Sequence, residues 1–101
     1  MEIIETPIFT KIVQNLFKDE SYRELQEKIV ENPEVGKIIP DSGGIRKVRW
    51  ALPGKGKRGG ARVLYYWYTS QNQILMLYAY AKNKQEDLTP EQLKALKAVL
   101  E

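Results

Sequence analysis

The residues best suited to chemistry form an unopposed basic stretch in the middle of the chain. Between Asp41 and Glu86 the sequence contains nine lysines and arginines and no acidic residue, whereas all 13 carboxylate side chains lie outside it. The nine are Arg46, Lys47, Arg49, Lys55, Lys57, Arg58, Arg62, Lys82 and Lys84. A block of uncompensated positive charge is typical of a surface that binds a polyanion, most often nucleic acid. The formal net charge of only +3 conceals this polarity.

Two missing residue types narrow the chemistry further. The chain has no histidine, which removes the usual general acid or base, the commonest metal ligand and every histidine-based triad. It has no cysteine, which removes thiolate metal sites and disulfides and is typical of a cytoplasmic protein. The carboxylates show no metal-ligand spacing, so we expect neither a metal nor a cofactor. Catalysis, if present, depends on Lys, Arg, Tyr, Asp or Glu.

Hydrophobic periodicity predicts the elements that position the basic residues. In chain order we expect a strand over 2–5, helices over 8–17 and 19–31, a strand over 47–52, a glycine-rich loop over 53–60, strands over 62–68 and 73–81, and a helix capped by Thr89 and Gln92. The order β-α-α-β-β-β-α predicts one α+β domain over residues 1–101. A small antiparallel sheet should pack against the two N-terminal helices, followed by the C-terminal helix. No apolar run reaches transmembrane length, so we expect no contact with a membrane.

Alternation along the strands places several basic side chains on one face. Lys47 and Arg49 share a face of their strand, opposite Val48. Arg62 begins the next strand and Lys82 ends the last, so these side chains converge if the three strands are neighbours. Like charges gathered in this way repel one another unless an anion lies between them, which favours a functional site over a merely soluble surface.

The glycine-rich loop has two possible functional interpretations. Gly54, Gly56 and Gly59 match G-x-G-x-x-G, but a strand rather than a helix follows, so a dinucleotide site is disfavoured. The loop instead favours phosphate contact, with Lys55, Lys57 and Arg58 as its charges; the alternative is a solvated hairpin.

Most aromatic residues occupy buried strand positions, namely Trp50, Tyr65, Trp67, Tyr78 and Tyr80. Tyr66 shares a face with Arg62 and is our candidate for stacking on a base.

Three segments together resemble the RelE/HigB-type toxins of bacterial toxin–antitoxin systems. They are GGIRKVRWA at 43–51, PGKGKRGGARV at 53–63, and YAKN at 80–83 followed by EDL at 86–88. The likeness covers nearly the whole chain and is nearest to the HigB-like branch. It implies a RelE-like fold and a toxin that inhibits translation by cutting mRNA on the ribosome. It also implies a cognate antitoxin, encoded beside the toxin, as partner. We expect the free toxin to be monomeric and cytoplasmic.

The resemblance also assigns roles to residues. It implies that Arg62 clamps the scissile phosphate and that Lys82 or Lys47 carries the proton in a metal-independent endoribonuclease. RNA-binding residues would be Arg46, Arg49, Lys55, Lys57, Arg58, Tyr66 and Lys84. The chain departs from the RelE pattern at Asn83, where that pattern has arginine, and at Thr89, where it has a catalytic tyrosine.

Other functions remain open at this stage. A ParE-like inhibitor of DNA gyrase has the same fold and a protein target. A non-catalytic RNA-binding module would bind RNA in a salt-sensitive way without cutting it. A degenerate toxin could use the basic face only to dock its antitoxin.

Overall fold

The computed structural model describes residues 1–52 and 56–100, and for residues 56–58 it describes the backbone alone. The strands are β1 (Glu2–Glu5), β2 (Lys37–Ile38), β3 (Arg46–Leu52), β4 (Gly56–Tyr68) and β5 (Gln73–Ala81). The helices are α1 (Pro7–Leu16), α2 (Asp19–Glu31) and α3 (Pro90–Val99), with one 3₁₀ turn, η1 (Thr69–Gln71). None of the helices in the described ranges has the length and apolar character needed to span a bilayer. The α+β class is confirmed.

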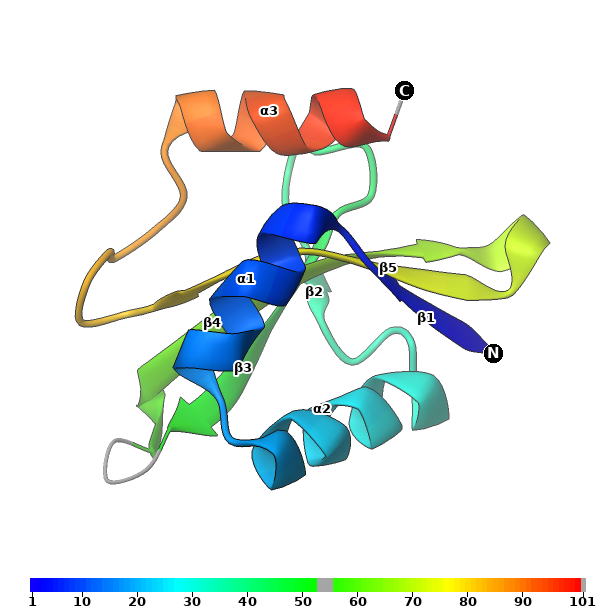
Figure 1. Ribbon diagram of the computed structural model, residues 1–101. Coiled ribbons are helices and arrows are strands. Elements are labelled where there is room, and N and C mark those ends of the chain that lie inside the picture. Colours follow the sequence, from blue (N-terminus) through cyan, green and yellow to red (C-terminus); the bar gives the residue numbers. More distant parts are fainter. Residues whose placement is uncertain (53–55, 101) are drawn as a thin grey trace.

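The five strands form one mixed sheet in the order β1-β5-β4-β3-β2 (Figure 1). Neighbouring strands are antiparallel, except that β1 runs parallel to β5, with Glu2 opposite Gln73. The predicted antiparallel pairing holds for three of the four strand pairs, and the parallel pairing of β1 with β5 makes the whole sheet mixed. The first strand and the last are far apart in sequence, and periodicity carries no information about which way they pair. The two-residue strand β2 was too short to be predicted.

The predicted loop over 53–60 was wrong for residues 56–60, because β4 begins at Gly56, and its part over 53–55 lies outside the described residues. The backbone of Leu52 pairs with that of Gly56 across β3 and β4. On the other side, the amide of Lys82 donates to the carbonyl of Gly60 at 2.9 Å. Backbone partners on both sides outweigh the low strand propensity of glycine, because strand formation depends strongly on context.

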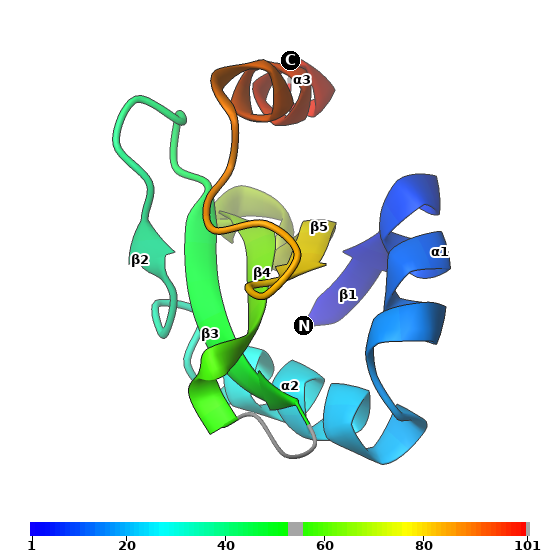
Figure 2. The same ribbon diagram turned by 90° about the vertical axis from the view of Figure 1, so that its left-hand side faces the viewer.

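The two faces of the sheet carry separate apolar clusters. Helices α1 and α2 cover one face, and the buried residues there are Phe9, Val13, Phe17, Leu25, Ile29, Val48, Ala61, Val63, Tyr65, Ile74, Met76 and Ala79. Helix α3 lies apart from both of them (Figure 2) and packs on the opposite face. The buried residues on that face are Ile45, Leu64, Leu77, Tyr80 and Leu96. The face beneath α3 is only partly covered, and the basic strand residues lie beside that helix.

The start of α3 agrees with the sequence prediction. Thr89 Oγ1 accepts a hydrogen bond from the amide of Gln92 at 3.1 Å, and Gln92 Oε1 accepts one from the amide of Thr89 at 3.0 Å. Pro90 occupies the first helical position, where its missing N–H costs nothing. This reciprocal cap fixes where the β5–α3 link ends.

A buried tyrosine secures the connection between α2 and β2. The Tyr65 side chain is fully buried; its Oη donates to the Pro33 carbonyl at 2.7 Å and accepts from the Gly36 amide at 2.9 Å. Tyr65→Phe should lower the free energy of unfolding by about 2–3 kcal/mol, because it leaves two backbone groups without a partner. Urea unfolding measures this effect. Tyr68→Phe is the matched control, since the Tyr68 hydroxyl makes no hydrogen bond within the described part of the chain; equal losses would contradict the prediction.

Candidate functional site

A row of three polar side chains crosses the middle of the sheet. In the strand register, Arg49 of β3 lies opposite Arg62 of β4, and Arg62 lies opposite Tyr80 of β5. The pairs beside this row, such as Val48 with Val63, belong to the cluster beneath α1 and α2. Because successive strand residues point to opposite faces, the row lies on the face that carries α3.

Two lysines flank this row. Lys47 precedes Arg49 by two residues, and its backbone lies opposite Leu64 of the α3-side cluster. Lys82 lies one residue beyond the end of β5, in the turn that follows, and its amide donates to the Gly60 carbonyl of β4 at 2.9 Å. The strand register brings Lys47, Arg49 and Arg62 to one face, and Lys82 lies beside them just after β5. We call Lys47, Arg49, Arg62 and Lys82 the basic face.

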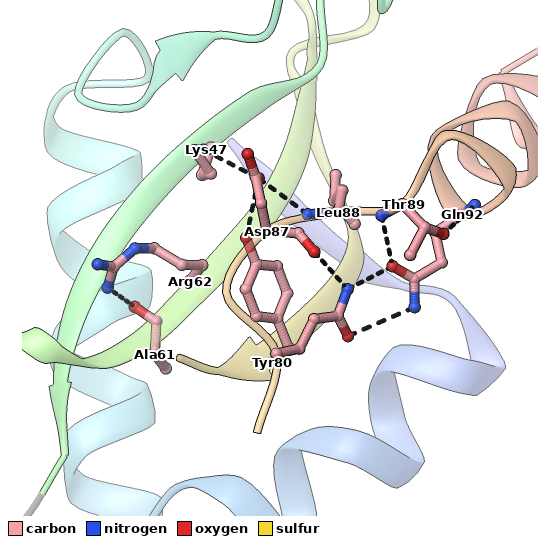
Figure 3. A network of polar contacts seen from close by, with 9 residues as sticks. Lys47, Ala61, Arg62, Tyr80, Asp87, Leu88, Thr89 and Gln92 are labelled. Carbon is pink, nitrogen blue, oxygen red and sulfur yellow. Dashed lines mark hydrogen bonds and ion pairs between the residues drawn. The ribbon is translucent and has the colours of Figure 1, made fainter. Parts of the chain in front are cut away.

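Arg62 is the most enclosed member of the basic face. Only 4% of its surface is exposed, whereas Arg49 is exposed and Lys47 and Lys82 are half-buried. Its Nη1 donates to the carbonyl of Ala61 at 3.2 Å (Figure 3). A guanidinium held by the protein in this way keeps its orientation when charge develops nearby, which is the arrangement that stabilises a transition state.

Tyr80 and Asp87 bring a hydroxyl and a carboxylate to the basic face. The Tyr80 hydroxyl lies 3.5 Å from Asp87 Oδ1, and Lys47 Nζ lies 3.5 Å from the same oxygen (Figure 3). Burial and, after it, the negative charge of Asp87 raise the pKa of Tyr80 to about 12, although Arg62 opposes the shift. The amide of Leu88, together with Lys47 and Tyr80, lowers the pKa of Asp87. At neutral pH the phenol is therefore protonated and the carboxylate is ionised.

Sequence reasoning assigned Tyr80 to the core and did not consider Asp87 as a site residue. Tyr80 is indeed buried, with 5% of its surface exposed, but its hydroxyl lies 3.5 Å from Asp87 Oδ1 at the basic face. Its position two residues before Lys82 was a usable signal, because alternation predicts that both lie on one face. Asp87 lies in the irregular β5–α3 link, within the EDL segment at 86–88 that belongs to the resemblance but carried no assigned role.

Several predicted RNA-binding residues lie elsewhere. Arg46 points to the opposite face, where its Nη1 donates to the Gly36 carbonyl at 2.8 Å and contacts the Glu34 carbonyl at 3.4 Å. Tyr66 packs edge-to-face on Tyr68, with ring centroids 4.7 Å apart, about 13 Å along β4 from Arg62 at the usual rise per residue.

Among the remaining predicted residues that the structure describes, Lys84 does not lie on the basic face. Lys84 lies beyond the end of β5 and lines a groove of about 580 Å³ shared with α1 residues such as Ile12. Lys55 and the side chains of Lys57 and Arg58 lie outside what the structure describes. Thr89 is committed to capping α3, and Asn83 is exposed in the turn after β5.

The site also includes a smaller recess and no acidic cluster. A pocket of about 400 Å³ adjoins Lys47 and Asp87, with Lys37, Ile39 and Leu93 among its walls. Within residues 1–52 and 56–100, no three carboxylates gather where they could hold a metal ion. The groups available here are therefore two arginines, two lysines, a protonated tyrosine and the carboxylate of Asp87.

Comparison with known proteins decides the family. The family model for the RelE toxin of the RelE/RelB toxin–antitoxin system matches residues 1–101. The chain belongs to the RelE toxin family. The predicted superfamily and the role as toxin of a toxin–antitoxin system are thereby confirmed, whereas the HigB-like branch stays a prediction.

Solved structures show that this RelE-family toxin has the RelE fold. A double arginine-to-alanine variant of E. coli toxin RelE in the free state matches with a TM-score of 0.63 and 12% identity, over 98% of this chain and 95% of that one. The toxin in the intact E. coli RelBE toxin–antitoxin complex matches with a TM-score of 0.58 and 15% identity, over 79% of this chain and 94% of that one. At these identities the likeness concerns the fold alone.

Proposed function

We propose that this toxin inhibits translation as a metal-independent endoribonuclease that cleaves mRNA on the ribosome. The row of Arg49, Arg62 and Tyr80, flanked by Lys47 and Lys82, is the observation that supports this function. A gyrase-directed toxin needs a surface that fits a protein and has no need of donors that converge on an anion. Membership of the RelE family supports the same proposal.

The cleavage step uses the ribose 2′-hydroxyl as its nucleophile. The 2′-oxygen loses its proton and attacks phosphorus, the bond from phosphorus to the 5′-oxygen breaks, and that oxygen takes up a proton. The products are a 2′,3′-cyclic phosphate and a 5′-hydroxyl. Arg62 and Arg49 stabilise the negative charge of the phosphorane. Lys82 or Lys47 takes up the proton that the 2′-hydroxyl loses, and Tyr80 donates a proton to the leaving 5′-oxygen.

The ribosome can align the RNA, which a shallow site does not do by itself. Most of the basic face lies on an open sheet beside α3, and it has few walls with which to align a flexible RNA. The ribosome holds mRNA in a fixed path, and such positioning can account for a large part of a rate enhancement. A cognate antitoxin is the second proposed partner, by analogy with the E. coli complex, and we expect a monomeric, cytoplasmic toxin in its absence.

Two arginines on opposite faces of one strand test this proposal. Arg49→Gln and Arg46→Gln remove the same charge from β3, but only Arg49 lies on the basic face. Primer extension on an mRNA, in a reconstituted translation reaction with and without ribosomes, should show ribosome-dependent cuts by the wild type. We expect Arg49→Gln to lower the cleavage rate at least tenfold, because it removes a charged donor from the phosphate. Arg46→Gln should retain the wild-type rate per folded molecule.

Equal losses in the two variants would contradict the assignment of the site to this face. Absence of cuts by the wild type under either condition would contradict the nuclease function itself.

A further inference from the structure

The Asp87 carboxylate lies against the basic face, where a bound anion would also lie. Three donors from different parts of the chain point at its Oδ1: the amide of Leu88 at 2.8 Å, and Lys47 Nζ and the Tyr80 hydroxyl at 3.5 Å each. Two of these donors, Lys47 and Tyr80, belong to the proposed catalytic set. Between residues that the structure describes, Lys47–Asp87 is the one ion pair, although the chain has 16 basic and 13 acidic residues.

The link that carries Asp87 is fixed by polar contacts on both sides. Gln85 Nε2 donates to the Asp87 carbonyl at 2.8 Å and also contacts Gln92 Oε1. Gln92 Nε2 in turn lies 3.3 Å from the Tyr78 hydroxyl on β5. These contacts tie the link and the start of α3 to the sheet, and Figure 3 shows the part of the network around Asp87, Thr89 and Gln92. The carboxylate is therefore placed against the basic face by the chain around it.

We infer that Asp87 is an internal substitute for a substrate phosphate, and that RNA binds by displacing its carboxylate from Lys47 and Tyr80. A carboxylate and a phosphate diester are both anions whose oxygens accept from an ammonium and a hydroxyl. The side chain of Asp87 is 70% exposed, so displacement exposes little additional surface. This inference rests on the proposed function, since it names the step that admits the substrate to the same site.

The displacement has a physical reason. Cations gathered on one face repel each other, and a nearby carboxylate lowers that repulsion while the site is empty. An exposed ion pair is worth at most about 1 kcal/mol, so an RNA phosphate that also reaches Arg62 can replace it. The carboxylate then acts as a modest barrier to anions that make fewer contacts.

Asp87→Asn and Glu86→Gln are the matched pair that tests the inference. Both remove one negative charge from neighbouring exposed positions, but Glu86 makes no polar contact within the described residues. Asparagine keeps an oxygen that can accept from the Leu88 amide. The probe is a 2′-O-methyl RNA oligonucleotide, which binds without being cleaved, with affinity measured by fluorescence anisotropy at fixed salt.

Asp87→Asn should bind this RNA about threefold more tightly than Glu86→Gln does, which is within the range for loss of an exposed ion pair. In a Lys47→Met background the added Asp87→Asn change should gain nothing over Glu86→Gln. Equal affinities in the two single variants, or weaker binding by Asp87→Asn, would overturn the inference. Weaker binding would mean that Asp87 positions Lys47 for RNA.

A second readout separates this inference from the nuclease function. Inorganic phosphate should raise the melting temperature of Asp87→Asn more than that of Glu86→Gln, because a ligand that binds the folded state stabilises it. If the wild type cleaves mRNA but the two variants respond alike to RNA and phosphate, the function stands and the inference fails. If Asp87→Asn gains affinity while the wild type cuts no mRNA, the anion site stands and the function fails.

Discussion

Arg62→Met is expected to lower the rate of ribosome-dependent mRNA cleavage by about 10²–10³-fold, the usual cost of removing one preorganised donor from a developing oxyanion. Arg62 lies between Arg49 and Tyr80 in the cross-strand row, and only 4% of the residue's surface is exposed. Its charge cannot be replaced by solvent or by a neighbour from the other face. Quantitative primer extension under single-turnover conditions measures the rate.

The choice of methionine separates chemistry from folding. Methionine keeps an unbranched chain of similar reach, so it fills the space that Arg62 occupies with little strain. Arg62→Lys should recover only part of the rate, because an ammonium is a point charge without the planar fork of a guanidinium. Arg23→Met, at an exposed position on α2, is the control for loss of a positive charge. A well-folded Arg62→Met variant with wild-type activity would refute the role of this arginine.

The elements could be predicted from sequence because their signals are local. Thr89, Pro90 and Gln92 mark the start of α3 within four residues, and the change in hydrophobic period at β3 marks the start of the sheet. The parallel pairing of β1 with β5 could not be predicted, since it joins residues about 70 positions apart. The strand character of Gly56 depends on partners in β3, and composition alone favours a loop.

The sequence predicted site residues only where strand alternation determines which face of the sheet a side chain occupies. Lys47 and Arg49 share a face in any register, and the structure adds Arg62 to that face as expected, whereas Lys82 lies just beyond the end of β5. Arg46 was counted among the predicted RNA-binding residues because of its charge alone, although the same alternation places it on the opposite face. The contact of Asp87 with Lys47 could not be predicted, although Asp87 belongs to a segment of the family resemblance, because the contact depends on how the β5–α3 link folds back over Lys47.

Tyr80→Phe is expected to lower the cleavage rate by about 10²-fold, because the variant has no hydroxyl to protonate the leaving 5′-oxygen. The ring stays buried, and within the described residues the hydroxyl loses only the hydrogen bond of 3.5 Å to Asp87, so stability should change little. Tyr78→Phe is the matched control: its hydroxyl lies two residues away on the same strand and contacts Gln92 rather than the basic face. Single-turnover rates of the two variants measure the difference.

The pH dependence of the wild type checks the same assignment. Because the pKa of Tyr80 is raised to about 12, the phenol keeps its proton throughout the neutral and mildly alkaline range and loses it only as the pH rises through that value. Ionisation of Tyr80 should therefore cause no fall in rate between about pH 7 and pH 10, where an ordinary phenol would begin to ionise. Any change in that range that persists in Tyr80→Phe belongs to another group. A Tyr80→Phe variant as active as Tyr78→Phe would transfer the role of proton donor to Lys82 or Lys47, the other donors on this face.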